Sequence, residues 1–392
     1  MVNRNTIMVA GLGGVGYELV QHLCHDPSIG RIVTADISTA TGHRRTNAAR
    51  YAAAYFDRYP DIEFHELDLL SVGDIVDLLE ETAPDLVFTA ATILPYGAFE
   101  ALPDEVTTEF LEFAPDGPGF ACIIPGQIPL VHNLMIAVEE ATTPEPHVVN
   151  ASLPDVVNPV LDRIDAGPLI GTGNVSHLIS PIKRACSDQF DVPMRAVDIR
   201  LVMSQTGVHA SFVNCSVRDV PYYLKITVEG EDVSEEFDLR STLEQNRLPF
   251  QTQPGETEIS TITGAASSRV ITALLHDTAE LVHAPGPNGL EGGFPVRLDR
   301  TGAEVVLPAD ISMSEAVEIG RDGNRYNGVE RIEEDGTVVF TEKTRNIFDT
   351  YLDLDISEFA PSDALDVTAS IIHGYQDLAA DHNIDPRMEV TW

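Results

Sequence analysis

The chain has 392 residues, 43% of them hydrophobic, which is enough for two domains with a substantial core. It carries 24 Lys and Arg against 62 Asp and Glu, a formal net charge of −38, so nucleic acid and anionic membranes are excluded as favourable partners. The acidic residues are spread along the whole chain, which is typical of a protein from a high-salt cytoplasm. We therefore expect cooperative unfolding in low salt, where the acidic charges are poorly screened.

The cysteine pattern and the hydropathy of the chain are also typical of a cytoplasmic protein. No two of the four cysteines form a CxxC pair, which predicts reduced, mostly buried thiols and neither a disulfide framework nor a zinc site. No apolar run reaches membrane-spanning length, and the first five residues leave no room for a signal peptide. We expect a cytoplasmic protein that acts on a small molecule. The cysteines are Cys24, Cys122, Cys186 and Cys215.

The stretch from Thr6 to Asp36 organises the rest of the chain. It reads as a strand (7–10), a glycine turn (11–16), a helix (17–23) and a second strand (32–35). The turn has the pattern GxGxxG in the strand-to-helix context that gives this pattern its meaning. In such a turn the first glycine permits a tight bend, the second lets a diphosphate approach the backbone, and the third lets the helix pack closely on the strand. The stretch therefore predicts a dinucleotide-binding unit.

The acid at the end of the second strand indicates which dinucleotide binds. Asp36 follows Gly16 by twenty residues, and a carboxylate there accepts hydrogen bonds from both ribose hydroxyls and repels a 2′-phosphate. NAD is therefore the expected cofactor, although Arg44 and Arg45 leave NADP open. The cofactor-binding residues that we predict are Gly11, Gly13, Gly14, Val15, Gly16, Asp36, Ile37, Asp68, Leu69, Ala90, Ala91 and Asn150.

Strands and helices alternate through the first half of the chain, which predicts a Rossmann-type parallel sheet in a dinucleotide-binding domain of residues 1–172. The segment 93–119 interrupts this alternation and is predicted to be either a lid or a surface excursion. The further strands expected here are 62–67, 86–90, 148–150 and 169–171, and the helices are 47–58, 72–81, 123–142 and one after Pro154.

The second half changes character and predicts a mixed α+β catalytic domain of residues 173–392 with antiparallel strands. Ser180 is expected to cap a helix whose first residue is Pro181. A Gly/Pro-rich passage covers 283–298. The strands expected are 196–204, 211–217, 222–229, 303–307 and 337–341, and the helices are 264–277, 314–320, 342–352 and 364–381.

Three motifs in this order resemble the lactate and malate dehydrogenase superfamily, which includes the NAD-dependent family 4 glycoside hydrolases. They are VVNASLPDVVNPVLD (148–162), GTGNV (171–175) and GVHAS (207–211). The resemblance implies an NAD-dependent oxidoreductase that acts on a secondary alcohol, a hydroxy acid or a sugar-like substrate. By analogy it also implies a homo-oligomer, either a dimer or a tetramer.

The third motif supplies a candidate acid/base. Oxidation of an alcohol needs a base to accept the hydroxyl proton as hydride leaves carbon, and imidazole suits that task. The resemblance assigns it to His209, expected between two strands, with His177 on the opposite wall. Each could instead be an ordinary surface or core histidine.

Two departures from the dehydrogenase pattern argue against lactate or malate as substrate. The positions of the orienting Asp and of the carboxylate-binding Arg correspond to His177 and Ser180, and 93–119 holds no arginine. The cations that we predict near an anionic substrate are Lys183, Arg184 and Arg269.

Two alternatives remain open at this point. One is a glycosidase or epimerase that oxidises a sugar transiently with the help of a metal; Gly173 replaces the Cys ligand of those relatives, so no metal ligand is assigned. The other is a non-catalytic NAD-binding sensor.

Overall fold

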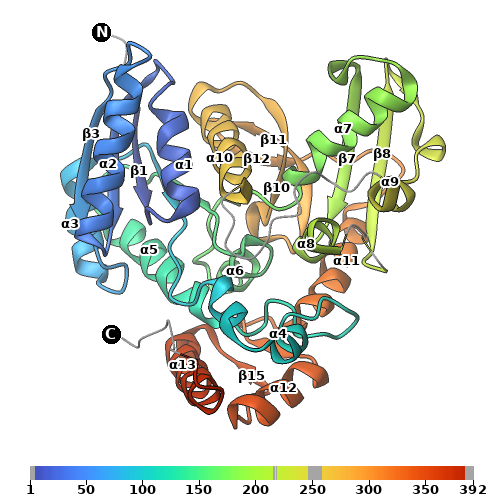
Figure 1. Cartoon of the computed structure of the whole chain (residues 1–392). Helices are drawn as coiled ribbons and strands as arrows, with labels where there is room; N and C mark the ends of the chain where they lie inside the picture. The colour runs from blue at the N-terminus through green and yellow to red at the C-terminus, as the bar shows by residue number, and fades with distance from the viewer. Residues whose placement is uncertain (1–4, 215–216, 218, 246–257, 385–392) are drawn as a thin grey trace.

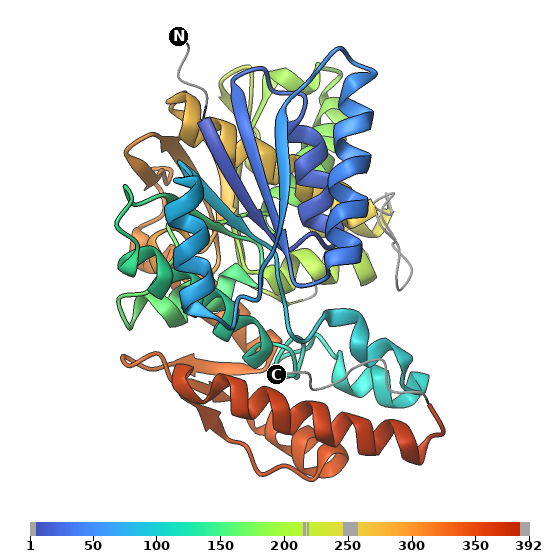
Figure 2. The same cartoon turned by 90° about the vertical axis from the view of Figure 1, so that its left-hand side faces the viewer.

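A six-stranded parallel sheet forms the first half of the protein. The computed structural model describes residues 5–214, 217, 219–245 and 258–384. The sheet has the strand order β3-β2-β1-β4-β5-β6, as a Rossmann-type fold requires, and Figures 1 and 2 show it with its covering helices. Its strands are β1 (Asn5–Ala10), β2 (Ile29–Asp36), β3 (Asp61–Glu66), β4 (Leu86–Thr89), β5 (His147–Asn150) and β6 (Ile170–Gly171). The helices of this half are α1 (Gly14–Leu23), α2 (Thr39–Ala54), α3 (Val72–Thr82), α4 (Asp104–Phe110), α5 (Ile128–Glu140) and α6 (Pro154–Asp162).

Strand β1 shows why the sheet is buried on both faces. Ile7 and Val9 belong to the core on the side of α1, whereas Met8 and Ala10 belong to the core on the side of α3 and α5. All four side chains are at most 1% exposed. A continuous apolar run is therefore what this strand needs, since successive side chains point to opposite faces.

The second half contains a mostly antiparallel sheet with the order β10-β11-β7-β8-β9, and β12 pairs with β11. Together with the parallel sheet it confirms the predicted fold class. The strands are β7 (Val197–Met203), β8 (Tyr222–Val228), β9 (Glu231–Asp232), β10 (Glu280–Pro285), β11 (Gly293–Asp299) and β12 (Gly302–Val305). The helices are α7 (Ser176–Phe190), α8 (Gln205–Asn214), α9 (Leu239–Gln245), α10 (Glu258–His276) and α11 (Met313–Asn324).

Two predictions for this half were wrong. The expected strand 211–217 overlaps helix α8, whose residues 206–211 are all buried or half-buried, so the period of a surface helix is absent from the sequence there. Helix α7 begins at Ser176 and holds Pro181 in its interior, one turn later than a first-position proline. The Gly/Pro-rich passage, for which no element was predicted, contains the end of β10 and most of β11.

The segment after β4, residues 93–119, packs into a hydrophobic core of the protein. It contains a 3-10 helix (Tyr96–Ala101) and α4, and its Phe99 and Phe110 are fully buried with ring centroids 5.3 Å apart. Tyr375 lies edge-on to Phe99 at 5.3 Å, so the C-terminal helix closes this core. The prediction of a surface excursion was wrong. The C-terminal elements are β13 (Val329–Ile332), β14 (Val338–Phe340), α12 (Glu342–Leu352), β15 (Glu358–Phe359) and α13 (Ala364–Asp381).

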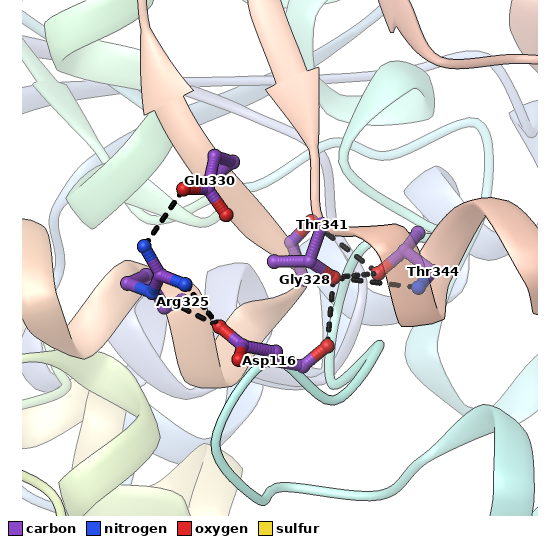
Figure 3. Close-up of polar contacts among 6 residues, drawn as sticks. All are labelled: Asp116, Arg325, Gly328, Glu330, Thr341 and Thr344. Carbon is purple, nitrogen blue, oxygen red and sulfur yellow. Dashed lines mark hydrogen bonds and ion pairs between the residues drawn. The ribbon is translucent and has the colours of Figure 1, made fainter.

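Polar contacts fix the same segment to the C-terminal elements, as Figure 3 shows. Asp116 Oδ1 accepts hydrogen bonds from Arg325 Nε at 2.9 Å and Arg325 Nη2 at 2.6 Å, and Arg325 Nη1 donates to Glu330 at 2.7 Å. The hydroxyl of Thr341 donates to the carbonyl oxygen of Asp116 at 2.7 Å. Residues more than 200 positions apart are therefore joined directly. The domain boundary that we placed at residue 173 stays a prediction.

Cys24, Cys122 and Cys186 are buried free thiols, as predicted, and Cys215 lies outside the described residues. Burial raises the pKa of the Cys186 thiol to about 11, which keeps it protonated. Within the described ranges, no helix combines the length and the apolar character needed to cross a membrane.

Candidate functional site

The glycine turn between β1 and α1 is built as the motif predicts. Gly11 has a φ of +90°, and a Cβ on it would lie 2.7 Å from the backbone nitrogen of Ala91. A Cβ on Gly16 would overlap the carbonyl oxygen of Gly11. A Cβ on Gly13, in contrast, would meet no protein atom within 4 Å. Gly11 and Gly16 are therefore required by the fold, whereas the open side of Gly13 leaves room for a ligand.

A cavity of about 370 Å³ lies beside this turn, at the carboxyl ends of β1, β2 and β4. Eight predicted cofactor residues line it, and the predicted Gly14, Val15, Gly16 and Asn150 do not. A Cβ on Gly14 would lie 2.5 Å from the hydroxyl of Ser260, so that glycine serves the packing of α1 on α10. The eight lining residues are Gly11, Gly13, Asp36, Ile37, Asp68, Leu69, Ala90 and Ala91.

The carboxylate of Asp36 is held in place at the end of β2. Its Oδ2 accepts a hydrogen bond from the backbone N–H of Leu12 at 2.7 Å, and its Oδ1 accepts one from Ser38 N at 2.8 Å. Each carboxylate oxygen keeps a further lone pair for a ligand.

Arg44 and Arg45, the cations that left NADP open as the cofactor, differ in their surroundings. Arg45 donates to the carbonyl oxygen of Leu12 and stands over the ring of Tyr17, whereas Arg44 is exposed.

Asn150 shapes the turn after β5. Its Nδ2 donates to the carbonyl oxygen of Ser152 at 3.1 Å and to Asn158 Oδ1 at 2.9 Å, and its Oδ1 accepts from Ser152 N at 2.8 Å. The hydroxyl of Ser152 donates to the carbonyl oxygen of Ala91, which lines the cavity. The side chain of Asn150 therefore holds the backbone next to the cavity.

His209 lies between strands β7 and β8 along the chain, as predicted, but it belongs to helix α8 and does not directly precede a strand. Its ring centroid is 4.2 Å from that of Phe113 and 5.1 Å from that of Phe120, so the packed segment after β4 covers it. Burial lowers the pKa of His209 to about 4, and the imidazole is neutral at pH 7. A neutral imidazole can accept a proton from an alcohol.

His177 lies in the first turn of α7 and is only 6% exposed. Its Nε2 is 3.1 Å from the hydroxyl of Thr263, which donates its one proton to the carbonyl oxygen of Ile259. The imidazole therefore donates from Nε2 to Thr263. Burial lowers the pKa of His177 to about 4. In this arrangement His177 anchors α7 to α10.

Sequence reasoning missed Asp155, a fully buried carboxylate in the first turn of α6. Its Oδ1 accepts from Asn174 Nδ2 at 2.7 Å, and its Oδ2 accepts from the backbone N–H of Gln205 at 2.5 Å. Burial raises the pKa of Asp155 to about 6. Asp155 thereby joins the parallel sheet to the first turn of α8, one turn before His209. Its position after Pro154 resembles an ordinary helix start, so the sequence carried no separate signal for it.

The predicted substrate cations Lys183, Arg184 and Arg269 are not among the residues that line the cavity. Arg184 pairs with Asp188 and Arg269 pairs with Glu280, and their side chains are 68% and 55% exposed. Burial lowers the pKa of His283 in β10 to about 3, and the charges of Arg200, Arg269 and Lys183 add to this shift. Ser180, at the position of the dehydrogenase arginine, is exposed. In the part of the chain that the structure describes, no three His, Cys, Asp or Glu side chains gather as a metal site would require.

Comparisons with solved structures identify the fold. The lactate dehydrogenase of Cryptosporidium parvum, in complex with lactic acid and NAD, has a TM-score of 0.55 and 16% identity and aligns over 83% of this chain and 97% of its own. The malate dehydrogenase of Archaeoglobus fulgidus in complex with NADH gives 0.52 and 18% over 81% and 95% of the two chains. That of Salinibacter ruber gives 0.52 and 16% over 82% and 95%.

The chain therefore has the fold of lactate and malate dehydrogenases, and the structural resemblance that we predicted is confirmed. No protein-family model matches the sequence. A search of curated proteins likewise finds no match.

Proposed function

We propose that this protein is an NAD-dependent dehydrogenase that oxidises a hydroxy acid or another secondary alcohol. The cavity beside the glycine turn carries the proposal, because it combines a backbone open at Gly13 with a fixed carboxylate at Asp36. A diphosphate would meet the first N–H groups of α1, and a ribose would meet Asp36. Solved structures with the same fold hold NAD or NADH.

In this proposal His209 is the acid/base and Asp155 fixes the start of its helix. Hydride would pass from the substrate carbon to the nicotinamide, and the hydroxyl proton would pass to the neutral imidazole. Without an arginine at position 180, the site has no guanidinium there to bind a carboxylate in two places. We therefore expect a preference for alcohols other than small 2-hydroxy acids such as lactate.

Two measurements test the proposal. Calorimetry in molar salt should detect NADH binding with NADPH weaker, since Asp36 repels a 2′-phosphate. A screen of alcohols, hydroxy acids and sugars with NAD, with and without manganese, should find a substrate that produces NADH. In His209→Asn, turnover of that substrate should fall roughly 10²- to 10⁴-fold while NADH binding stays unchanged. Absence of heat from either coenzyme would refute the proposal.

A second candidate is an NAD-binding sensor without turnover. The aromatic side chains around His209 favour it, because Phe113 and Phe120 occupy two sides of the ring that a substrate would have to approach. The sensor would bind NADH with the affinity that calorimetry measures and convert no compound in the screen. In that case His209→Asn would leave every measured property of the bound state unchanged.

A further inference from the structure

A compact loop from Glu112 to Phe120 carries the aromatic cover of His209; we call it the aromatic loop. The carbonyl oxygen of Glu112 accepts a hydrogen bond from the backbone N–H of Gly119 at 3.2 Å, which closes the loop at its base. The rings of Phe113 and Phe120 stand at this base, with centroids 4.8 Å apart, and both contact the ring of His209. The aromatic loop therefore separates part of the imidazole from water.

One arginine holds the tip of the aromatic loop, as Figure 3 shows. Arg325 Nε and Nη2 both donate to Asp116 Oδ1, at 2.9 and 2.6 Å, and Arg325 Nη1 donates to Glu330 of β13 at 2.7 Å. The guanidinium is therefore shared between a carboxylate of the aromatic loop and a carboxylate of β13. Among the described residues, neither carboxylate forms an ion pair with any other cation.

The backbone that follows Arg325 packs directly on the aromatic loop. Arg325 begins a turn that ends at Gly328. A Cβ on Gly119 would lie 2.5 Å from the carbonyl oxygen of Tyr326, and a Cβ on Gly328 would lie 2.6 Å from the carbonyl oxygen of Pro118. Glycine at these two positions lets the two backbones touch, so the loop and the turn form one packed unit with Arg325 at its edge.

We propose that Arg325 is a positioning residue for His209, because its hold on Asp116 keeps the aromatic loop against the imidazole ring. Without the guanidinium, the carboxylates of Asp116 and Glu330 would repel each other, and the tip of the loop would lose its tie to β13. Water would then reach the ring and favour its charged form. In the intact protein, burial lowers the pKa of His209 to about 4 and keeps the imidazole neutral at pH 7.

The acidic side chains on the elements around His209 have partners of their own in the part of the chain that the structure describes. Burial is the cause of the lowered pKa of His209, and no charge among the described residues contributes to it. A change in this pKa therefore reports on the cover of the ring. The pairs are Glu112 with Lys343, Asp116 with Arg325 and Asp219 with Arg240, and Asp155 accepts a hydrogen bond from Asn174.

The consequence for catalysis rests on the proposed function, in which His209 is the acid/base. A neutral imidazole accepts a proton from an alcohol, whereas the imidazolium donates one to a ketone. Each pH unit by which the pKa of His209 rose would increase the imidazolium fraction at pH 7 about tenfold. Arg325 would thus favour oxidation without contact with the substrate.

An NMR titration of carbon-labelled histidine in molar salt tests the proposal without coenzyme or substrate. The signal of His209, identified by its loss in His209→Asn, should keep the neutral chemical shift in the wild type from pH 7 down to about pH 5. In Arg325→Gln and in Asp116→Gly its midpoint should rise by about one pH unit or more. Asp116 has a φ of +60°, which glycine adopts freely, and Asp116→Gly leaves no unpaired carboxylate in the loop. A rise in that variant therefore reports the entry of water.

Arg331→Gln is the matched control, because Arg331 of β13 pairs with Glu333 at 2.7 Å and should leave the midpoint of His209 unchanged. A wild-type midpoint near pH 6.5 would overturn the proposal, as would an unchanged midpoint in Asp116→Gly. A rise in Arg325→Gln alone would come from the freed carboxylate and would overturn it as well. If Arg325→Gln fails to fold, Asp116→Gly decides. Failure of the proposed function would leave this titration unchanged, since it needs no turnover.

Discussion

Gly13→Ala should separate a cofactor turn from a structural turn. The substitution suits the fold, because Gly13 has a φ of −64°, which alanine adopts freely, and its Cβ would meet no protein atom within 4 Å. Replacing glycine at such a position changes stability by about 1 kcal/mol or less. The new methyl group would occupy the space that a diphosphate needs next to the first N–H groups of α1.

The loss of affinity can be estimated from the hydrogen bonds at this turn. A diphosphate displaced by a methyl group would lose at least one charge-assisted hydrogen bond to the backbone, worth about 1.5–3 kcal/mol. That corresponds to a roughly 10- to 100-fold weaker dissociation constant for NADH. Calorimetry in molar salt measures it, and the melting temperature of the same sample reports on the fold.

Gly16→Ala is the matched control. Its Cβ would overlap the carbonyl oxygen of Gly11, which is backbone and cannot rotate away, so α1 must shift. Overpacking of this kind costs about 1–3 kcal/mol, and both stability and binding should fall. If Gly13→Ala bound NADH as tightly as the wild type, the diphosphate could not lie over this residue and the assignment of the turn would be wrong.

Three further results are expected. Asp36→Asn should weaken NADH binding and raise the NADPH affinity relative to NADH in calorimetry, because the amide no longer repels a 2′-phosphate; an unchanged ratio would exclude Asp36 as the selecting group. Burial lowers the pKa of His177 to about 4 and that of His283 to about 3, against about 6.5 in the unfolded chain. Because only the unfolded chain binds these protons between pH 6.5 and pH 4, the protein should be fully stable above pH 6.5 and lose stability as the pH falls towards 4. Between pH 7 and pH 5 each of the two histidines should lower the free energy of unfolding, measured with denaturant, by about 2 kcal/mol. Asp155, whose pKa is raised, should offset part of this loss. His283→Gln should make the free energy of unfolding depend less steeply on pH, and an unchanged dependence would contradict a contribution from His283. Dilution from molar to millimolar salt should lower the melting temperature cooperatively, since 62 acids face 24 cations; an equal melting temperature would refute salt dependence.

The cofactor side of the fold could be predicted because its signals are local. Strand, glycine turn and helix follow one another within 24 residues, and Asp36 closes the next strand, so each element constrains its neighbour. Four of the eight lining residues come from this stretch, and the other four, Asp68, Leu69, Ala90 and Ala91, follow the next two strands of the same alternating pattern.

The substrate side could not be predicted in the same way because its contacts are distant in sequence. Phe99 is buried by Tyr375, and Asp116 is paired with Arg325, more than 200 residues later. The sequence within and next to residues 93–119 does not distinguish a lid from a segment that packs into the core. Helix α8 gave a misleading local signal, since burial on several sides removed the amphipathic period that marks a surface helix.

The low pKa of His209 also bears on the direction of the proposed reaction. With a pKa of about 4, the imidazole is protonated in roughly one molecule in 10³ at pH 7. Oxidation of an alcohol uses the neutral form, whereas reduction of a ketone uses the imidazolium. Initial rates of reduction should therefore rise about tenfold for each pH unit between pH 7 and pH 5, while those of oxidation stay flat. A reduction rate that is constant over this range would assign the proton transfer to another group, because burial of His209 against Phe113 and Phe120 disfavours its charged form.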